Sequence, residues 1–215
     1  MSLYLASASP RRKALLEQLG LSFDVCPVDA DESVFEAEVG SCYVERLAKL
    51  KANMALDKLR AASDIDASAG HSLYVIGSDT SVVVDGVILG KPLDQNDFSK
   101  MMNRLSDSTH EVLTGICVLR YDISTEKVVE ESLVVSTDVR FKCLSDSEIS
   151  AYWHSGEPAD KAGGYGIQGL GAVLVSAING SYSNVVGLPV SELKELLVGM
   201  GFDFWGSLAT NGPSI

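Results

Sequence analysis

The sequence predicts an α/β fold on a mixed β-sheet, arranged in two lobes around a cleft. Three observations lead to this fold class. Apolar runs of strand length alternate with helical patterns toward both ends of the chain, extended segments joined by a hairpin turn occupy its middle, and no repeat or linker divides it. We therefore expect a single domain over residues 1–206 and a flexible tail over 207–215.

The chain begins with a strand, a loop and a helix. Residues 3–6 are apolar and predict a short buried strand. Ser9 suits the N-cap of the next helix, Pro10 suits its first turn, and Gly20 supplies the C-terminal stop. The longest helical pattern covers residues 41–62. The later helices are expected to begin at Asp94, at the Ser145/Glu148 capping box and at Pro189.

Extended patterns fill the middle of the chain. Residues 73–77 predict a strand that ends at Ser78-Asp79-Thr80, and a second strand over 81–84 turns at Asp85-Gly86 into a hairpin. The segment that ends at His71 is expected to be a surface loop, and residues after Gly206 show no periodicity. Further strands are expected at 23–27, 87–89, 111–121, 133–141 and 172–178, the last after a glycine-rich segment over 163–171.

The charge balance argues against a partner that is a nucleic-acid polymer. The 215 residues include 17 Lys and Arg against 29 Asp and Glu, a net charge of −12, and an acidic surface repels a polyanion. The first 60 residues are almost neutral and contain the run Arg11-Arg12-Lys13. A site for a small anion is therefore expected in this part of the chain.

The four cysteines lie far apart, without the spacing of a zinc site, and are expected to be buried reduced thiols. The first residues lack the pattern of a secretory signal, and no stretch is long and apolar enough to span a membrane. These features predict a cytoplasmic protein without a membrane partner. The cysteines are Cys26, Cys42, Cys117 and Cys143.

Two glycine motifs do not have the context that their usual functions require. Gly164 to Gly169 satisfies GxGxxG, but it follows a loop and precedes a predicted strand, whereas a dinucleotide site needs a strand before it and a helix after it. Gly86 to Lys91 resembles a phosphate-binding loop but has the wrong spacing.

The segment from Ser7 to Arg12 is a better candidate for a phosphate site. It lies where a strand passes into a helix, so backbone N–H groups and the positive end of the helix dipole converge there. Two guanidinium groups can bind phosphate oxygens in bidentate fashion. Because cations at a helix start oppose the dipole, Arg11 and Arg12 favour an anion site over a merely solvated first turn.

Asp79 is the second candidate. A carboxylate that follows a buried apolar strand is costly unless it is paired, hydrogen-bonded or bound to a metal, although an Asp at a strand end can also cap the local backbone. Three weaker candidates are Lys51, Lys91 and Glu32.

Six segments, taken together and in this order, resemble the Maf family of nucleotide pyrophosphatases. The resemblance runs from about residue 3 to residue 200. The segments are LASASPRR (Leu5 to Arg12), RLAKLKA (Arg46 to Ala52), GSDTSV (Gly77 to Val82), GKP (Gly90 to Pro92), DKAGGYGIQG (Asp160 to Gly169) and VVGLP (Val185 to Pro189).

This resemblance implies an elongated mixed sheet like that of the inosine triphosphate pyrophosphatase class, a homodimer, and hydrolysis of a nucleoside triphosphate to the monophosphate and pyrophosphate. It implies a divalent cation, Mg²⁺, Mn²⁺ or Co²⁺, with Asp79 and Glu32 at the metal and Asp79 as the catalytic acidic residue. Whether Asp79 mainly binds metal or accepts a proton is left open. The implied substrate-binding residues are Ser7, Ser9, Arg11, Arg12, Lys51 and Lys91.

Arg11, Thr80 and Gln168 correspond to the positions at which the family's branches differ in specificity. The three residues are similar to those of the branch that acts on dTTP and UTP, which implies a house-cleaning enzyme for normal or modified pyrimidine nucleotides. Gln168 offers both a donor and an acceptor to the edge of a base. Two alternatives are a nucleotide-sensing regulator of cell division without significant turnover and a pyrophosphatase for methylated GTP.

Overall fold

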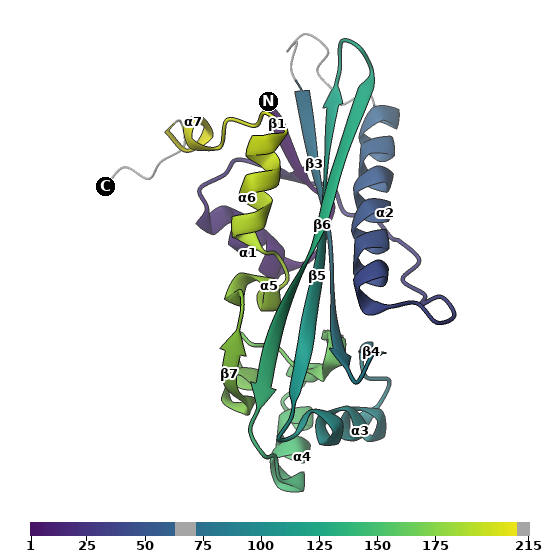
Figure 1. The fold of residues 1–215 in the computed structure, drawn as a ribbon, viewed down its shortest axis with the longest axis vertical. Helices are drawn as coiled ribbons and strands as arrows, with labels where there is room; N and C mark the ends of the chain where they lie inside the picture. The colour runs from purple at the N-terminus through teal and green to yellow at the C-terminus, as the bar shows by residue number, and fades with distance from the viewer. Residues whose placement is uncertain (63–71, 210–215) are drawn as a thin grey trace.

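One mixed sheet forms the central layer of the computed structural model, which describes residues 1–62 and 72–209 (Figure 1). Its strand order is β2-β1-β3-β5-β6-β7, and β4 pairs with β3. The two pairs that involve β1 are parallel, and the others are antiparallel. The strands are β1 (Ser2–Leu5), β2 (Asp24–Val25), β3 (Ser72–Val84), β4 (Val87–Leu89), β5 (Thr109–Asp122), β6 (Lys127–Phe141) and β7 (Val175–Asn179).

Helices cover both faces of this sheet. Helix α2 lies along one face, α1, α5 and α6 lie on the other, and α3 and α4 pack at one end (Figure 1). None of the helices in the described ranges has the length and hydropathy of a membrane span. The helices are α1 (Pro10–Gln18), α2 (Gly40–Ala61), α3 (Gln95–Leu105), α4 (Asp146–His154), α5 (Tyr182–Val186), α6 (Val190–Gly199) and α7 (Phe204–Ala209), with 3₁₀ turns at Glu157–Asp160, Ala162–Gly164 and Leu170–Leu174.

The capping signals place the helix starts correctly. The side chain of Ser9 accepts from the backbone N–H of Arg12, and Asp94 accepts from the N–H of Asp97. Ser145 and Glu148 form the predicted capping box. These interactions satisfy backbone donors that a helix leaves unpaired at its first turn. The predicted starts of α1, α3 and α4 are therefore confirmed, and α6 begins at Val190, directly after Pro189, without a side-chain cap.

Two lobes share the sheet and have separate cores. One lobe packs α1 and α6 against one face and α2 against the other, and the second lobe packs α3 and α4 against the ends of β5 and β6. The predicted α/β fold, an elongated mixed sheet in two lobes, is thus confirmed (Figure 1). The single-domain boundary at residue 206 stays a prediction.

Helix α2 packs unusually close to the sheet because two glycines face it. A Cβ on Gly77 of β3 would lie 2.1 Å from the carbonyl oxygen of Ala48, and a Cβ on Gly115 of β5 would lie 2.3 Å from that of Val44. Any side chain at either position would therefore push the helix outward. This approach sets the height of Lys51 above the sheet.

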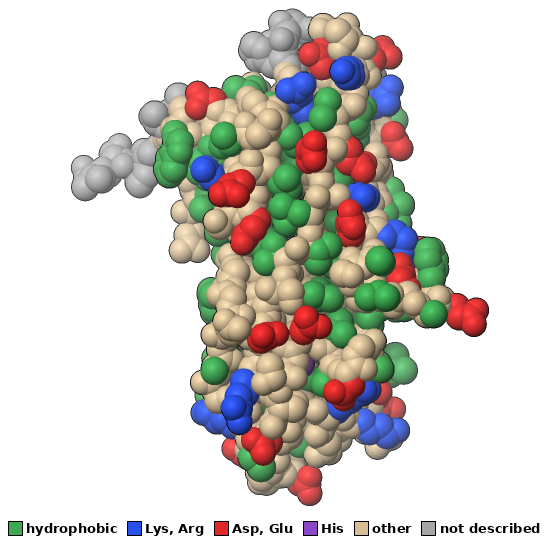
Figure 2. All heavy atoms as spheres, viewed as in Figure 1, with side chains coloured by type: hydrophobic (Ala, Val, Ile, Leu, Met, Phe, Trp, Pro, Cys, Tyr) green, Lys and Arg blue, Asp and Glu red, His purple; other side chains and the backbone are tan. Residues whose placement is uncertain are grey.

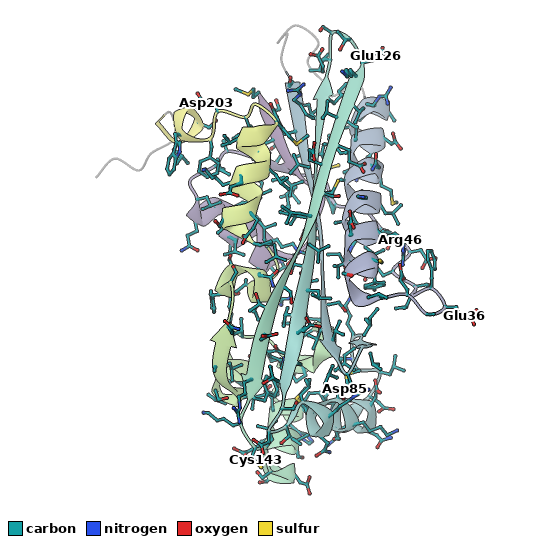
Figure 3. The ribbon with its side chains drawn as sticks, viewed as in Figure 1. Glu36, Arg46, Asp85, Glu126, Cys143 and Asp203 are labelled. Atoms are coloured by element: carbon teal, nitrogen blue, oxygen red, sulfur yellow. The ribbon has the colours of Figure 1, made fainter. Side chains whose placement is uncertain are left out.

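Several expectations are corrected. Strand β3 does not end at Ser78-Asp79-Thr80 but runs unbroken through them, because each of these residues pairs with β5. Residues 172–174 belong to a 3₁₀ turn, and β7 starts at Val175. Cys42 and Cys143 are exposed rather than buried; Cys143 lies near the end formed by α3 and α4 (Figure 3).

Part of the predicted tail lies within the described residues. Residues 207–209 continue helix α7, which starts at Phe204. The rest of the predicted tail, 210–215, and the predicted surface loop up to His71 lie outside the described residues.

Candidate active site

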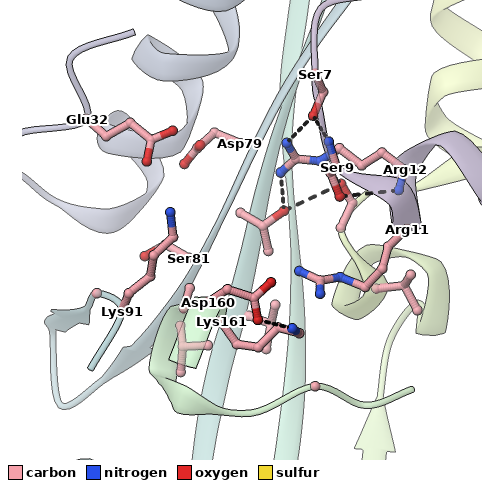
Figure 4. A pocket seen from close by; sticks show the side chains of 18 of the residues that line it. Ser7, Ser9, Arg11, Arg12, Glu32, Asp79, Ser81, Lys91, Asp160 and Lys161 are labelled. Atoms are coloured by element: carbon pink, nitrogen blue, oxygen red, sulfur yellow. Dashed lines mark hydrogen bonds and ion pairs between the residues drawn. The ribbon is translucent and has the colours of Figure 1, made fainter. Parts of the chain in front are cut away.

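One cavity is lined by all the residues that were predicted from the sequence for the site. It measures about 630 Å³ and is lined by the β1–α1 loop, helix α2, strands β3 and β4, and the glycine-rich segment (Figure 4). This is the size of a pocket for a small-molecule ligand. The predicted residues on its wall are Ser7, Ser9, Arg11, Arg12, Glu32, Lys51, Asp79, Thr80, Lys91 and Gln168.

The cavity opens onto a stretch of β3 that has no paired strand on one side. Strand β1 pairs with β3 as far as Ile76, and β4 pairs with it from Val82. Between them, residues 77–81 form an edge of the sheet. Alternate side chains of a strand point to opposite faces, so an open edge lets one ligand reach groups from both faces.

Lys51 joins two carboxylates on the face covered by α2. Its Nζ lies 2.6 Å from Oε1 of Glu32 and 2.6 Å from Oδ1 of Asp79. Burial raises the pKa of Asp79, although the charges of Lys51 and Arg12 act in the opposite direction. Burial also tends to raise the pKa of Glu32, but Lys51, Lys91 and Arg12 together hold it below its usual value.

Asp79 faces α2 because of its position in the strand. It lies two residues after Gly77 and pairs in register with Gly115, so all three positions point to the same face. The glycines let α2 approach, and Lys51 then reaches the carboxylate from above. Asp79 is therefore a buried mid-strand carboxylate with a cationic partner, and its interpretation as a backbone cap at a strand end is wrong.

The loop that carries Glu32 projects from the molecule, with Glu36 near its tip, and is tied to α2 (Figure 3). The hydroxyl of Tyr43 donates to the backbone carbonyl of Glu32 at 2.9 Å. Arg46 donates to the carbonyl of Ser33 at 3.0 Å and binds Glu38 through Nε and Nη2. These contacts fix the position of Glu32, and none of them was predicted from the sequence.

Arg12 lies on the opposite face of β3 and makes three hydrogen bonds. Its Nε donates to the carbonyl of Gly187 at 2.8 Å, Nη1 to the hydroxyl of Ser7 at 3.2 Å, and Nη2 to the hydroxyl of Thr80 at 3.1 Å. Burial lowers the pKa of Arg12, and Asp79 partly offsets this effect. The guanidinium is thus held in one orientation before any ligand binds.

The three predicted specificity positions have different surroundings. Thr80 is the most constrained, because its hydroxyl also lies 3.0 Å from the hydroxyl of Thr114. Its hydroxyl therefore bonds protein groups, Arg12 among them, although Thr80 also lies on the cavity wall. Arg11 and Gln168 lie on the cavity wall.

The glycine-rich segment is held in place by a carboxylate. Glu157 accepts hydrogen bonds from the N–H groups of Leu170 and Gly171, at 2.9 Å each, and from the hydroxyl of Tyr152 at 2.8 Å. The same hydroxyl accepts from the N–H of Gly166 at 3.2 Å. This network shapes the wall that contains Gln168.

Sequence reasoning missed two charged residues on the wall. Lys161 and Asp160 form an ion pair there, and the Lys161 side chain is only 14% exposed. Figure 4 shows this pair on the same side of the cavity as Arg11. Both belong to the DKAGGYGIQG segment, in which only Gln168 was assigned a role, so the motif itself was the available signal.

The donor set fits a divalent cation that arrives with a phosphate ligand. Within residues 1–62 and 72–209, no group of three or more His, Cys, Asp or Glu side chains could hold a metal alone. Mg²⁺ is commonly held by one or two carboxylates together with substrate phosphates and water. Glu32 and Asp79 can supply those two carboxylates.

Comparison with known proteins identifies relatives over most of the chain. Residues 2–200 match the family model described as Maf-like protein. A dTTP/UTP pyrophosphatase of Pseudoalteromonas translucida is 54% identical over 91% of this chain and 95% of its own. Proteins of the same name from Colwellia psychrerythraea and Vibrio vulnificus are 48% and 49% identical, over 93% and 91% of this chain and 89% and 96% of theirs.

Among solved structures, the Ham1 protein of Staphylococcus aureus aligns with 93% of this chain and 100% of its own, at 14% identity and a TM-score of 0.43.

Proposed function

The chain belongs to the Maf family, and we propose that it is a pyrophosphatase that hydrolyses dTTP and UTP to the nucleoside monophosphate and pyrophosphate. One observation carries this proposal: a buried carboxylate, Asp79, shares a substrate-sized cavity with several cations. Relatives that are about half identical bear the name of this activity. The roles given to single residues below are part of the proposal.

The cations of the cavity bind and orient the triphosphate. Arg12 is held by three hydrogen bonds on one face of β3, and Lys51 is held by two carboxylates on the other. Lys91 lies across the cavity from Arg12, near Glu32 (Figure 4). Phosphates placed at the open edge of β3 between these groups are bound from several sides, which offsets their charge and fixes their orientation.

Asp79 accepts the proton of the attacking water. An Asp whose pKa is raised by burial is a stronger base than an exposed one and is still ionised at neutral pH when a cation is beside it. A divalent cation, Mg²⁺, Mn²⁺ or Co²⁺, would be held by Glu32 and Asp79 with phosphate oxygens, and it would offset charge on the phosphates. Gln168, which lies in the glycine-rich segment, forms hydrogen bonds with the edge of the base.

The decisive experiment is pyrophosphate release by Asp79→Asn, which keeps the shape of the side chain but removes its charge. We expect loss of turnover in this variant and normal turnover in Asp57→Asn, a control at an exposed position of α2. Near-normal turnover by Asp79→Asn would exclude Asp79 as the catalytic residue.

A substrate panel tests the specificity. Normal and modified triphosphates are offered with each of the three cations, and pyrophosphate is measured against phosphate. dTTP and UTP should be preferred; preference for methylated GTP would place the protein in the other branch, and binding without turnover would indicate a nucleotide-sensing regulator. The homodimer and the cytoplasmic location stay predictions, which light scattering and cell fractionation would test.

A further inference from the structure

Lys51 occupies the space between the two carboxylates that are available to a divalent cation. Its ammonium lies 2.6 Å from both Glu32 and Asp79, so one oxygen of each carboxylate already has a cationic partner. The side chains of Lys51 and Asp79 are only 10% and 9% exposed. Water therefore screens this pair weakly, and the charges act strongly on any ion that enters.

The position of Lys51 is set by the fold rather than by its own flexible side chain. Helix α2 is pressed onto the sheet at Gly77 and Gly115, and Lys51 follows Ala48, the residue in contact with Gly77, by one turn. The Cα of Lys51 is thus fixed above Asp79. The ammonium can leave the carboxylates only if another cation or an anionic ligand changes the balance of charge around it.

The charges around this pair disfavour a free metal ion. Glu32 and Asp79 carry two negative charges, Lys51 cancels one, and the charges of Lys91 and Arg12 also act on the carboxylates. A divalent cation that enters alone therefore meets several positive groups. A triphosphate reverses this balance, because its phosphates bind the same cations and bring additional ligands for the metal.

We propose that Lys51 is an internal cation that prevents a free divalent metal ion from binding to Glu32 and Asp79 but allows a metal–triphosphate complex to bind there. Metal and nucleotide then enter together. This inference rests on the proposed function for its ligand, but its central statement concerns metal binding without a nucleotide. Lys51 acts here as a positioning residue whose removal changes metal affinity before any chemistry occurs.

The test is Mn²⁺ binding, followed by the loss of the free-ion signal in electron paramagnetic resonance without nucleotide. Wild type should bind Mn²⁺ weakly. Lys51→Met and the polar variant Lys51→Gln should bind it at least about tenfold more tightly, which corresponds to about 1.4 kcal/mol. Lys49→Met is the matched control, because Lys49 pairs with Glu45 on the exposed side of the same helix, and it should bind as wild type does.

Three further measurements complete the design. Adding Glu32→Gln to Lys51→Met should abolish the gain, which places the new affinity at this pair. Adding a non-hydrolysable UTP analogue to wild type should increase Mn²⁺ binding. Thermal melting shows which variants are folded, and Lys51→Gln serves if Lys51→Met is not.

The inference is wrong if folded Lys51 variants bind Mn²⁺ no better than wild type, or if wild type binds the free ion as tightly as they do. Its failure can be distinguished from failure of the proposed function. If the Lys51 variants gain affinity but wild type releases no pyrophosphate from any nucleotide, the proposed activity is wrong while the role of Lys51 stands.

Discussion

Replacing Gly77 with alanine should separate helix α2 from the sheet and move Lys51 away from Asp79. The new Cβ would lie 2.1 Å from the carbonyl oxygen of Ala48 and 2.8 Å from the backbone N of Ala52, whereas Cβ atoms essentially never approach other atoms within 3.0 Å. Both contacts are with backbone, which cannot rotate aside as a side chain does. The helix must therefore retreat, and both 2.6 Å contacts of Lys51 must lengthen with it.

The magnitude follows from the cost of overpacking, about 1–3 kcal/mol. For a chain of this length, each kcal/mol lowers the melting temperature by about 2–4 °C, so Gly77→Ala should lower it by roughly 2–12 °C. Calorimetry gives this shift, and pyrophosphate release should fall in the same variant at a temperature where it is still folded. The control is Gly199→Ala in α6, because a Cβ there would meet no atom within 4 Å.

Two outcomes would refute this reasoning. If Gly77→Ala melts as wild type does, the close approach of α2 does not depend on the glycine. If it is destabilised but retains full turnover, the distance between Lys51 and Asp79 does not control activity. Loss of stability in Gly199→Ala would show that alanine in place of glycine is harmful for a reason other than contact with the backbone.

Three further predictions concern single groups of the site. The folded-state pKa of Asp79 is raised, so its contribution to stability is complete below the reference value of 3.8 and is lost as the pH rises through the folded-state pKa. Asp79→Asn should therefore have a higher melting temperature than wild type at neutral pH. Thermal melts should show this difference in melting temperature decreasing as the pH falls toward 3.8. Glu157→Gln replaces one acceptor with a donor facing a backbone N–H; urea denaturation should show a loss of about 1–3 kcal/mol, with a raised KM. Arg12→Lys keeps the charge but cannot keep all three hydrogen bonds, so KM for UTP should rise by roughly tenfold, and an unchanged KM would contradict the role of these bonds.

Local signals were enough to predict where α1, α3 and α4 begin, whereas α5 and α7 were not predicted. Ser9, Asp94 and Ser145 mark helix starts through hydrogen bonds made within three residues along the chain, so the sequence contains the whole interaction. The turn at Asp85-Gly86 is local in the same sense: both residues have positive φ, and the strands that flank them pair directly.

Features that depend on distant partners were not predictable in this way. Polar residues at Ser78 to Thr80 suggested a strand end, but pairing with β5 carries the strand through them. The open edge at residues 77–81 depends on where β1 ends and where β4 begins. Lys51 was only a weak candidate in the sequence, because its burial follows from the packing of α2 onto two glycines of distant strands. The site residues were found through their motifs, whereas the contacts that hold them, such as those of Glu157 and Arg46, join distant segments.

The net charge of the protein and the charge of its cavity have opposite signs. The whole chain carries −12, and on the face shown in Figure 2 acidic side chains are spread among basic ones over the described residues. The cavity wall instead combines five cations, Arg11, Arg12, Lys51, Lys91 and Lys161, with three carboxylates, Glu32, Asp79 and Asp160. At physiological salt, exposed charges are screened over about 8 Å, so the outer acids act weakly inside a partly enclosed cavity. A small polyanion therefore experiences the local excess of cations, while the acidic exterior still repels a long one. Lys51 is central to this difference, because the cation that pairs with Asp79 is also available to bind a phosphate when a nucleotide enters.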